Sequence, residues 1–297
     1  MHAILLIGFS CQDFVFSVDD LPSKGEKYRA RSLEVVGGGL SANAAVAIAR
    51  LGGRAILVTY LGDDGTGRDI LAELAAEGVD CSLSRRFAGA RSPLSAIAVD
   101  KRGERMILNY ADLSIPPDIA WLPERLPPGV CAVQGDSRWE PGSIHAFRLA
   151  RGAGVPSVLD ADRAVRSPDI LTAPTHVAWS AQGLREMTGA NDLSAAVAAE
   201  SRRRGNWVAV TDGENGCWFA RDGRVEHEPA FAVDVVDTLG AGDTFHGALT
   251  LALGQGMPER RAVRFASAAA ALKCTRFGGR KGVPAQDEVE RLVAGRN

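Results

Sequence analysis

The sequence predicts an α/β fold, with a central, mainly parallel sheet flanked by helices and a small β-sheet lid. From residue 130 onward, short apolar runs alternate with segments of helical period, which is typical of parallel strands joined by helical crossovers. Nearer the N-terminus, more polar β-rich runs interrupt that alternation. We expect these runs, at about 12–36 and 94–112, to form a lid at the sheet edge where open α/β folds bind ligands.

The first third of the chain is predicted to contain two core strands, two helices and the lid. Continuous apolar runs indicate core strands, polar β-rich runs indicate strands exposed on one face, and 3.6-residue periodicity indicates helices. On these criteria we expect core strands at 3–8 and 55–60, lid strands at 14–18, 28–36, 95–100 and 105–110, and helices at 41–51 and 69–77.

The other two thirds follow the regular strand–helix alternation, without a tandem repeat or a low-complexity linker. We therefore expect a single domain spanning residues 1–297, which contains the lid. The predicted strands are 130–134, 157–160, 176–179, 207–211 and 217–220, and the predicted helices are 142–152, 183–188, 193–204, 244–254 and 259–275.

The composition excludes several classes of protein. Hydrophobic residues make up 46% and charged residues 24%, which is ordinary for a globular chain and excludes disorder as the main state. A net charge of −2 argues against nucleic-acid binding and membrane-surface binding, and no apolar run approaches a bilayer span. The five cysteines are widely spaced, without C-x-x-C, and the N-terminus lacks a basic leader. These features predict a cytoplasmic protein.

The most informative segment is residues 235–245, V-V-D-T-L-G-A-G-D-T-F. We expect its valines to end a strand and a helix to begin at the Gly-Ala-Gly turn, where free N–H groups and the helix dipole form an anion site. An Asp in this turn would repel a bound anion, unless it removes a proton from a hydroxyl that attacks a phosphate. The alternative is that Asp243 is only a helix cap.

This segment resembles the C-terminal signature of the PfkB/ribokinase sugar kinases. Their N-terminal signature is matched by Gly38-Gly39-Leu40-Ser41-Ala42-Asn43, followed by Leu61-Gly62-Asp63-Asp64. The two signatures lie about 200 residues apart, in the family's order, and the resemblance covers essentially the whole chain. It implies a ribokinase-like fold and an ATP-dependent carbohydrate kinase, a transferase that uses Mg²⁺.

The resemblance also implies roles for individual residues in phosphoryl transfer and sugar binding. Asp243 matches the catalytic base, and the anion hole that stabilises the transferring phosphoryl group is matched by Gly240, Ala241 and Gly242. Asp13 matches the carboxylate that binds sugar hydroxyls. The residues that bind the sugar from the other side are matched by Gly38, Gly39 and Asn43.

For the cofactors, the resemblance implies a nucleotide loop at Thr211, Gly213 and Gly216, and an adenine contact at Cys274. Asp237, with the loop around Gly278-Gly279-Arg280, matches a monovalent-cation site and so implies K⁺. One departure concerns Mg²⁺: many members carry Asn-x-x-Glu after the fourth or fifth strand, but here Ser180 and Gly183 take those places. Ketohexokinases look similarly altered, so kinase activity is still expected.

Further stretches, among them G-E-K-Y-x-A-R, I-L-N-Y and G-G-R-x-G-x-P, resemble the sulfofructose kinases of sulfoglycolysis. In that group, residues matching Lys27, Asn109 and Arg138 bind the sulfonate. A sulfonate is a monoanion with three acceptor oxygens, which suits these donors. The resemblance implies phosphorylation of the 1-hydroxyl of 6-deoxy-6-sulfofructose, a sugar with a terminal anionic group. The simpler interpretation is that Lys27 and Arg138 are solvated surface charges.

Three alternatives remain at this point. The enzyme could instead phosphorylate another ketose or ketose phosphate, such as fructose or fructose 6-phosphate, or ribose. A Rossmann oxidoreductase would use the glycines at 37–39, although its G-x-G-x-x-G belongs directly after the first strand. A non-catalytic sugar- or nucleotide-binding regulator would not need Asp243. The exposed edges of lid strands can pair with a second subunit, so we expect a homodimer through the lid.

Overall fold

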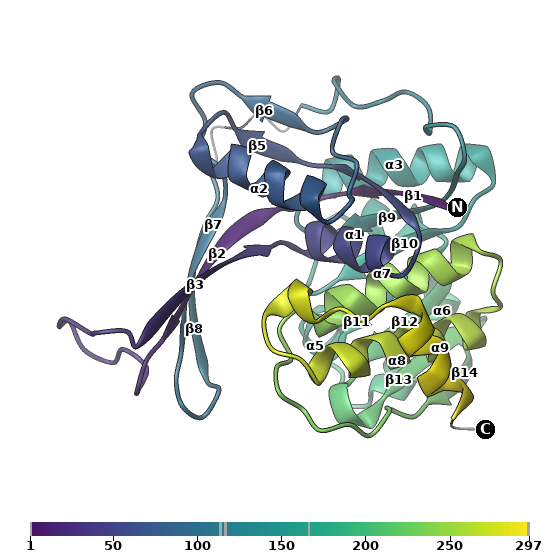
Figure 1. Cartoon of the computed structure of the whole chain (residues 1–297). Helices are drawn as coiled ribbons and strands as arrows, with labels where there is room; N and C mark the ends of the chain where they lie inside the picture. The colour runs from purple at the N-terminus through teal and green to yellow at the C-terminus, as the bar shows by residue number, and fades with distance from the viewer. Residues whose placement is uncertain (1, 113–114, 116–117, 166, 296–297) are drawn as a thin grey trace.

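The computed structural model describes residues 2–112, 115, 118–165 and 167–295 (Figure 1). Over these residues the predicted fold class is confirmed, because a mainly parallel sheet lies between two layers of helices. The strands of this large sheet are, in spatial order, β14 (Arg224–Glu228), β13 (Cys217–Arg221), β12 (Trp207–Thr211), β11 (His176–Ser180), β10 (Ser157–Ala161), β9 (Val130–Asp136), β1 (Ala3–Ile7) and β4 (Arg54–Val58).

The large sheet is parallel from β4 to β12 and antiparallel beyond it, where β13 and β14 form a hairpin. The sequence analysis did not predict β14. Its residues, R-V-E-H-E, are mostly polar and the first three are exposed, so they lack the apolar run that marks the core strands.

Alternation along the strands gives the sheet two apolar faces. In β1, Ile4 and Leu6 point to one face, and Ala3, Leu5 and Ile7 point to the other. The first face is covered by α1 (Leu40–Arg50), α2 (Gly65–Ala76), α7 (Ala241–Gly254), α8 (Glu259–Cys274) and α9 (Gln286–Ala294). The second face is covered by α3 (Glu140–Ala153), α4 (Asp169–Thr172), α5 (Ala181–Thr188) and α6 (Leu193–Arg204).

A second sheet, which we call the small sheet, extends away from the body of the molecule (Figure 1). Its spatial order is β3 (Ser32–Gly38), β2 (Cys11–Ser17), β7 (Leu94–Val99) and β8 (Arg105–Tyr110). The strand expected at 28–36 begins only at Ser32 and continues to Gly38. Residues 18–31 join β2 to β3 outside any strand, at the free end of the small sheet. A short parallel pair, β5 (Tyr60–Gly62) and β6 (Arg85–Phe87), lies beside α2.

The strand expected at residues 235–236 is absent: within the described chain neither residue belongs to a strand, and Val236 lies in a bend. The amides of Val236 and Asp237 instead donate to the carbonyl oxygen of Cys274 at the end of α8, at 2.8 and 3.1 Å. Both valine side chains are exposed. Apolar sequence indicated a strand here, but the backbone is held by a helix end.

None of the helices over the described residues is long and apolar enough to cross a membrane.

Candidate active site

The N-terminus of α7 lies at the carboxyl edge of the large sheet and is shaped by Gly240. This residue has φ 78°, a left-handed conformation that glycine adopts without strain, and it turns the chain into the helix. The helix then begins at Ala241, whose amide donates to the Thr238 carbonyl at 3.2 Å. The amides of Gly242 and Asp243 belong to the first turn, where an α-helix leaves N–H groups without intrahelical acceptors. This arrangement can receive an anion.

Asp243, the third residue of α7, does not cap the helix. Its Oδ2 accepts a 2.7 Å hydrogen bond from Nδ2 of Asn43, which lies on α1. The two sequence signatures therefore meet through these side chains. Asn43 is buried, and its Oδ1 has no hydrogen-bond partner among the described residues. An acceptor left open beside a carboxylate fits a hydroxyl-bearing ligand.

The surroundings of Asp243 weaken its acidity. Burial, followed by the charge of the neighbouring Asp160 carboxylate, raises the pKa of Asp243 to about 7, although the Asn43 hydrogen bond and His246 oppose the rise. Asp162 adds to the increase. A carboxylate with a pKa near 7 can exchange a proton at neutral pH, as a general base must.

His246 packs behind Asp243 as a hydrogen-bonding residue. Its Nδ1 lies 2.7 Å from the Gly242 carbonyl oxygen and 3.3 Å from Oδ2 of Asp160, and its Nε2 lies 3.1 Å from the Ala178 carbonyl oxygen. Burial lowers the pKa of His246 and raises that of Asp160. Each ring nitrogen faces a carbonyl oxygen, so Nδ1–H can donate to Gly242 and Nε2–H can donate to Ala178.

On the small-sheet side, Asp13 on β2 lies against Gly38 on β3. A Cβ at Gly38 would come within 2.2 Å of Asp13 Oδ2, so only glycine permits this approach. The thiol of Cys11 donates to Asp13 Oδ1 at 3.3 Å, and burial raises the pKa of Asp13. Gly39, whose φ is 97°, caps α1 next to this cluster. Asp13, Gly38 and Gly39 therefore lie together in one cluster at the start of α1.

The three residues expected to bind a terminal anion have different neighbours. Asn109 on β8 is exposed, and its Nδ2 donates to Ser95 Oγ at 3.1 Å, next to the Asp13 cluster. Arg138, in the turn after β9, forms an ion pair with Asp162. Lys27 is exposed within residues 18–31, at the free end of the small sheet. Asn109 thus contacts Ser95 beside the Asp13 cluster, and Arg138 contacts Asp162, which influences Asp243. Among the described residues no hydrogen bond or ion pair joins Lys27 to either of them.

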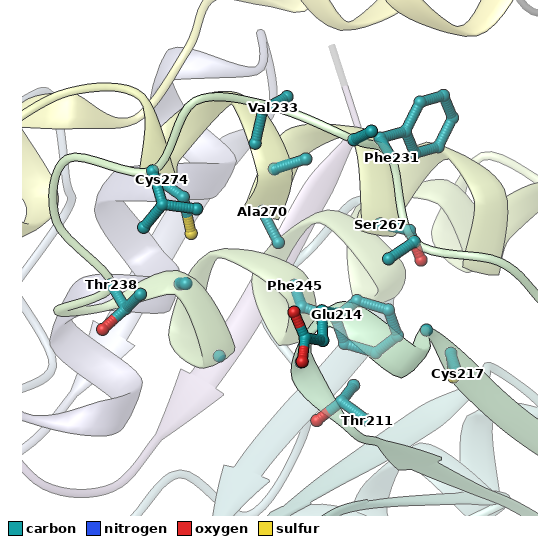
Figure 2. Close-up of a pocket in the computed structure, with 18 residues that line it drawn as sticks. Thr211, Glu214, Cys217, Phe231, Val233, Thr238, Phe245, Ser267, Ala270 and Cys274 are labelled. Atoms are coloured by element: carbon teal, nitrogen blue, oxygen red, sulfur yellow. The ribbon is translucent and has the colours of Figure 1, made fainter.

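The residues expected to bind the nucleotide converge on one cavity. A cavity of about 570 Å³, within the usual range for small-molecule sites, lies between β12, α7 and α8. Figure 2 shows Thr211 and Cys274 at this cavity. It is also lined by Gly213, in the short helix Gly213–Asn215, by Gly216 directly after it, and by Ala241 and Gly242. The cavity therefore reaches the N-terminus of α7.

Sequence reasoning missed part of this cavity wall. Phe231 and Val233 come from the irregular segment after β14, for which no motif was available. Ser267, Ala270 and Cys274 share one face of α8 and also line the cavity. Their spacing of three and four residues could have shown that a row of small side chains continues from Cys274.

A second cavity, of about 350 Å³, separates the small sheet from the loops at 235–239 and 277–279. The small sheet contacts the first loop through Arg105, whose Nη2 donates to Thr238 Oγ1 at 3.0 Å. This hydrogen bond therefore links the small sheet to the loop that precedes α7.

The altered magnesium motif has a structural use. Ser180 caps α5: its Oγ accepts from the Gly183 amide at 3.0 Å and donates to the Asp162 carbonyl at 3.1 Å. A Cβ at Gly183 would lie 2.7 Å from the Ala161 carbonyl oxygen, so a Glu cannot be placed there without movement. Among the described residues, no group of three or more His, Cys, Asp and Glu is arranged to hold a metal ion. Asp160 and Asp162 are the carboxylates that adjoin Asp243.

Asp237 is held by hydrogen bonds from several directions. Its Oδ1 accepts from the Leu239 amide at 2.8 Å, and its Oδ2 accepts from the amides of Gly278 and Gly279, both at 3.1 Å, and from Lys273 Nζ, also at 3.1 Å. Burial alone would raise its pKa, but these bonds outweigh burial and hold the pKa of Asp237 below its usual value. Asp237 is therefore an anchored carboxylate.

The Gly37–Gly39 run does not have the place of a Rossmann phosphate loop. Gly37 and Gly38 end an antiparallel strand of the small sheet, whereas the Rossmann loop directly follows the first parallel strand. The oxidoreductase alternative is therefore rejected on topology. What the structure does bring together is a helix N-terminus with free amides, the buried carboxylate of Asp243 and a cavity of small-molecule size.

Comparison with known proteins identifies the kind of enzyme. The chain belongs to the PfkB family: a family model described as "pfkB family carbohydrate kinase" matches residues 1–286. A fructokinase from Klebsiella pneumoniae is 30% identical, over 86% of this chain and 91% of its own. The expectation of a carbohydrate kinase is thus confirmed.

Two solved structures share the whole fold. A protein from Agrobacterium tumefaciens, provisionally assigned as a ribokinase, is 36% identical, with a TM-score of 0.88 over 99% of this chain and 98% of its own. Ribokinase from Arabidopsis thaliana, solved with ribose and ATP, is 24% identical, with a TM-score of 0.85 over 99% of both chains. The ribokinase-like form of the predicted fold is thereby confirmed.

Proposed function

We propose that this carbohydrate kinase uses ATP to phosphorylate the 1-hydroxyl of 6-deoxy-6-sulfofructose and forms the 1-phosphate. The observation that supports it most is the hydrogen bond between Asn43 and Asp243 at the N-terminus of α7. It supports the proposal because the Asp243 carboxylate and the Asn43 amide meet next to the cavity that Gly242 lines.

In this reaction Asp243 accepts the proton of the attacking hydroxyl. The new bond forms between the sugar oxygen and the γ-phosphorus, and the bond from that phosphorus to the bridging oxygen of ADP breaks. Amides of the first turn of α7, among Gly240, Ala241 and Gly242, stabilise the charge on the transferring group. Asp13 and the open Oδ1 of Asn43 hold sugar hydroxyls, so that the reacting one faces Asp243.

ATP fits the 570 Å³ cavity, with its base toward Cys274 and its phosphates toward the end of α7. The Arabidopsis ribokinase bound to ribose and ATP supports this assignment through its shared fold. Mg²⁺ keeps several waters and is held by one or two carboxylates with substrate phosphates, so Asp162 and Asp160 suffice without a Glu at position 183. When bound, Mg²⁺ would neutralise phosphate charge.

The substrate's sulfonate is assigned to Arg138 and Asn109. Arg138 offers a planar set of N–H donors near the carboxyl end of β9, and Asn109 adjoins the Asp13 cluster through Ser95. Lys27 is exposed at the free end of the small sheet, so it can join them only through a movement of that sheet or from a second subunit.

The test is kcat/KM with MgATP for 6-deoxy-6-sulfofructose, fructose 6-phosphate, fructose and ribose. We expect a preference of at least about 100-fold for the sulfonate, which corresponds to about 2.7 kcal/mol of transition-state discrimination. A preference for another of these sugars would leave the kinase in place and refute the sulfonate. Binding of ATP and sugar without product would favour the non-catalytic regulator.

Variants paired with matched controls test whether Arg138 and Lys27 contact the sulfonate. Arg138→Ala should lower kcat/KM for the sulfonate sugar more than for fructose, whereas Arg148→Ala, at an exposed arginine that also faces an aspartate, should change neither. Lys27→Ala is compared with Lys24→Ala, since both lysines are exposed in residues 18–31. If each variant and its control changed kcat/KM equally, Arg138 and Lys27 would not be sulfonate contacts.

A homodimer through the small sheet is part of the proposal. Large apolar side chains are exposed on its two edge strands, β3 and β8: Leu33, Val35, Ile107, Leu108 and Tyr110. Exposed apolar area and strand edges both favour association. Light scattering should give twice the 31.4 kDa chain mass, and Leu108→Glu should halve it. A wild-type monomer would contradict this part.

A further inference from the structure

Lys273 is fully buried, at 0% exposure, in the last turn of α8. The sequence contains four other lysines, at positions 24, 27, 101 and 281, and all of them are exposed. A buried ammonium is costly unless an anion and hydrogen bonds compensate it. The partner of Lys273 is therefore informative.

The Lys273 ammonium contacts both kinds of oxygen through which Asp237 could bind a cation, the main-chain carbonyl oxygen and a carboxylate oxygen. Nζ donates to the Asp237 carbonyl oxygen at 2.7 Å and to its carboxylate Oδ2 at 3.1 Å. The other oxygen, Oδ1, accepts from Leu239 and lies 3.9 Å from a guanidinium nitrogen of Arg105. A metal cation could reach the carbonyl and Oδ2 only by displacing a fully enclosed ammonium. The residues present therefore do not fit the monovalent ion that the family resemblance implies.

The same contacts lead directly to the anion-binding turn. Asp237 stands three residues before Gly240, and its Oδ1 fixes the Leu239 amide between them. The amides of Val236 and Asp237 donate to Cys274, the residue after Lys273. Oδ2 also holds the amides of Gly278 and Gly279. One positive charge at this point fixes both loops beside the helix end.

We propose that the Lys273 ammonium takes the place of the monovalent cation in this kinase and holds the anion-binding turn, so that the enzyme needs no K⁺. Lys273 is a positioning residue, because it acts through Asp237 and does not touch the reacting groups. This inference rests on the proposed function only for its kinetic consequence.

The occupancy of the site can be tested without any activity. Crystals of the wild-type protein soaked in rubidium or thallium(I) salts should show no anomalous peak beside the Asp237 carbonyl. A peak at that position would overturn the proposal, whether or not the protein phosphorylates a sugar.

The kinetic test compares kcat in potassium chloride and in tetramethylammonium chloride at equal ionic strength. We expect the two values to agree within about twofold, and a rise of about tenfold with K⁺ would overturn the proposal. Absence of product with every sugar would refute the proposed function, while the diffraction result would still decide the cation question.

Lys273→Met retains most of the side-chain volume and removes the charge, and Lys281→Met is the control at an exposed lysine on the neighbouring loop. In folded Lys273→Met, kcat should fall and K⁺ should restore part of it, and K⁺ should raise Tm only in this variant. Equal losses in Lys281→Met, or a folded Lys273→Met that ignores K⁺ in both readouts, would overturn the proposal. The diffraction test needs no variant, so a misfolded Lys273→Met would not prevent a decision.

Discussion

Asn43 donates a 2.7 Å hydrogen bond to Asp243, a residue 200 positions further along the chain. The bond ends on Oδ2 of a carboxylate whose pKa burial and Asp160 raise to about 7. A donor stabilises the ionised form of a carboxylate, so Asn43 limits this rise. The pair therefore sets the pH at which the base becomes available.

The first prediction concerns the pH dependence of the wild-type reaction. A general base works only when it is deprotonated, so kcat/KM should fall as the pH decreases through about 7. Asp243→Asn should lose about 10²–10⁴-fold in kcat/KM and abolish this acid limb. Asp169→Asn, at an exposed aspartate, is the control. An acid limb that persists in the residual activity of Asp243→Asn would assign the titration to another group.

The second prediction concerns Asn43, the hydrogen-bond donor to Asp243. Asn43→Ala removes the hydrogen bond that lowers the Asp243 pKa, so the acid limb of kcat should move to higher pH. The groups that also face Asp243, namely Asp160, Asp162 and His246, are unchanged in this variant. Asn191→Ala, at an exposed asparagine, should leave the profile in place. If the acid limb of Asn43→Ala stayed at the same pH or moved to lower pH, this role of Asn43 would be contradicted.

The sequence located these two residues because each belongs to a short signature whose glycines mark a turn. The helices and most strands followed from periodicity, since their apolar faces are buried on the large sheet. The ion pair of Lys273 with Asp237 did not follow. It joins a helix end to a loop 36 residues away, and within an Ala-rich helix a single lysine gives no periodic signal.

The sulfonate residues show a second limit of the sequence. Pattern matching placed Lys27 and Arg138 in one pocket, but their surroundings depend on tertiary structure. Arg138 meets Asp162 because two strand ends are adjacent, whereas Lys27 follows the path of an irregular connection. The strand predicted at Val235 and Val236 was wrong for a related reason. Backbone hydrogen bonds to Cys274 replace strand pairing there, and the composition of the segment does not reveal those bonds.

The third prediction concerns the effect of the Asp243 carboxyl group on the thermal stability of the protein. A carboxyl group whose pKa is raised on folding favours the folded state while it is protonated, and this contribution is lost as the pH rises through about 7. At pH 8 the wild type carries the ionised form, and Asp243→Asn carries a neutral isostere. The variant should therefore have the higher Tm at pH 8, and the difference should shrink toward pH 5. A variant less stable than the wild type at pH 8 would contradict the raised pKa.

The fourth prediction concerns Gly37, at the end of β3. A Cβ at this position would lie 1.3 Å from Nη2 of Arg280, whose guanidinium is buried and lies 2.7 Å from Glu73. The guanidinium cannot move aside without weakening that pair, so Gly37→Ala should reduce the free energy of unfolding by about 1–3 kcal/mol. Gly25→Ala is the control, because nothing lies within 4 Å of its added Cβ.

A double-mutant cycle separates this clash from a general effect of alanine. In an Arg280→Ala background the obstructing side chain is gone, so Gly37→Ala should cost much less than in the wild type. Urea unfolding of the four proteins measures the coupling directly. Equal costs in the two backgrounds would show that Gly37 is required by its backbone and not by Arg280. Arg280 also lowers the pKa of Asp13. The Arg280→Ala background that relieves the clash at Gly37 should therefore also bind the sugar more weakly.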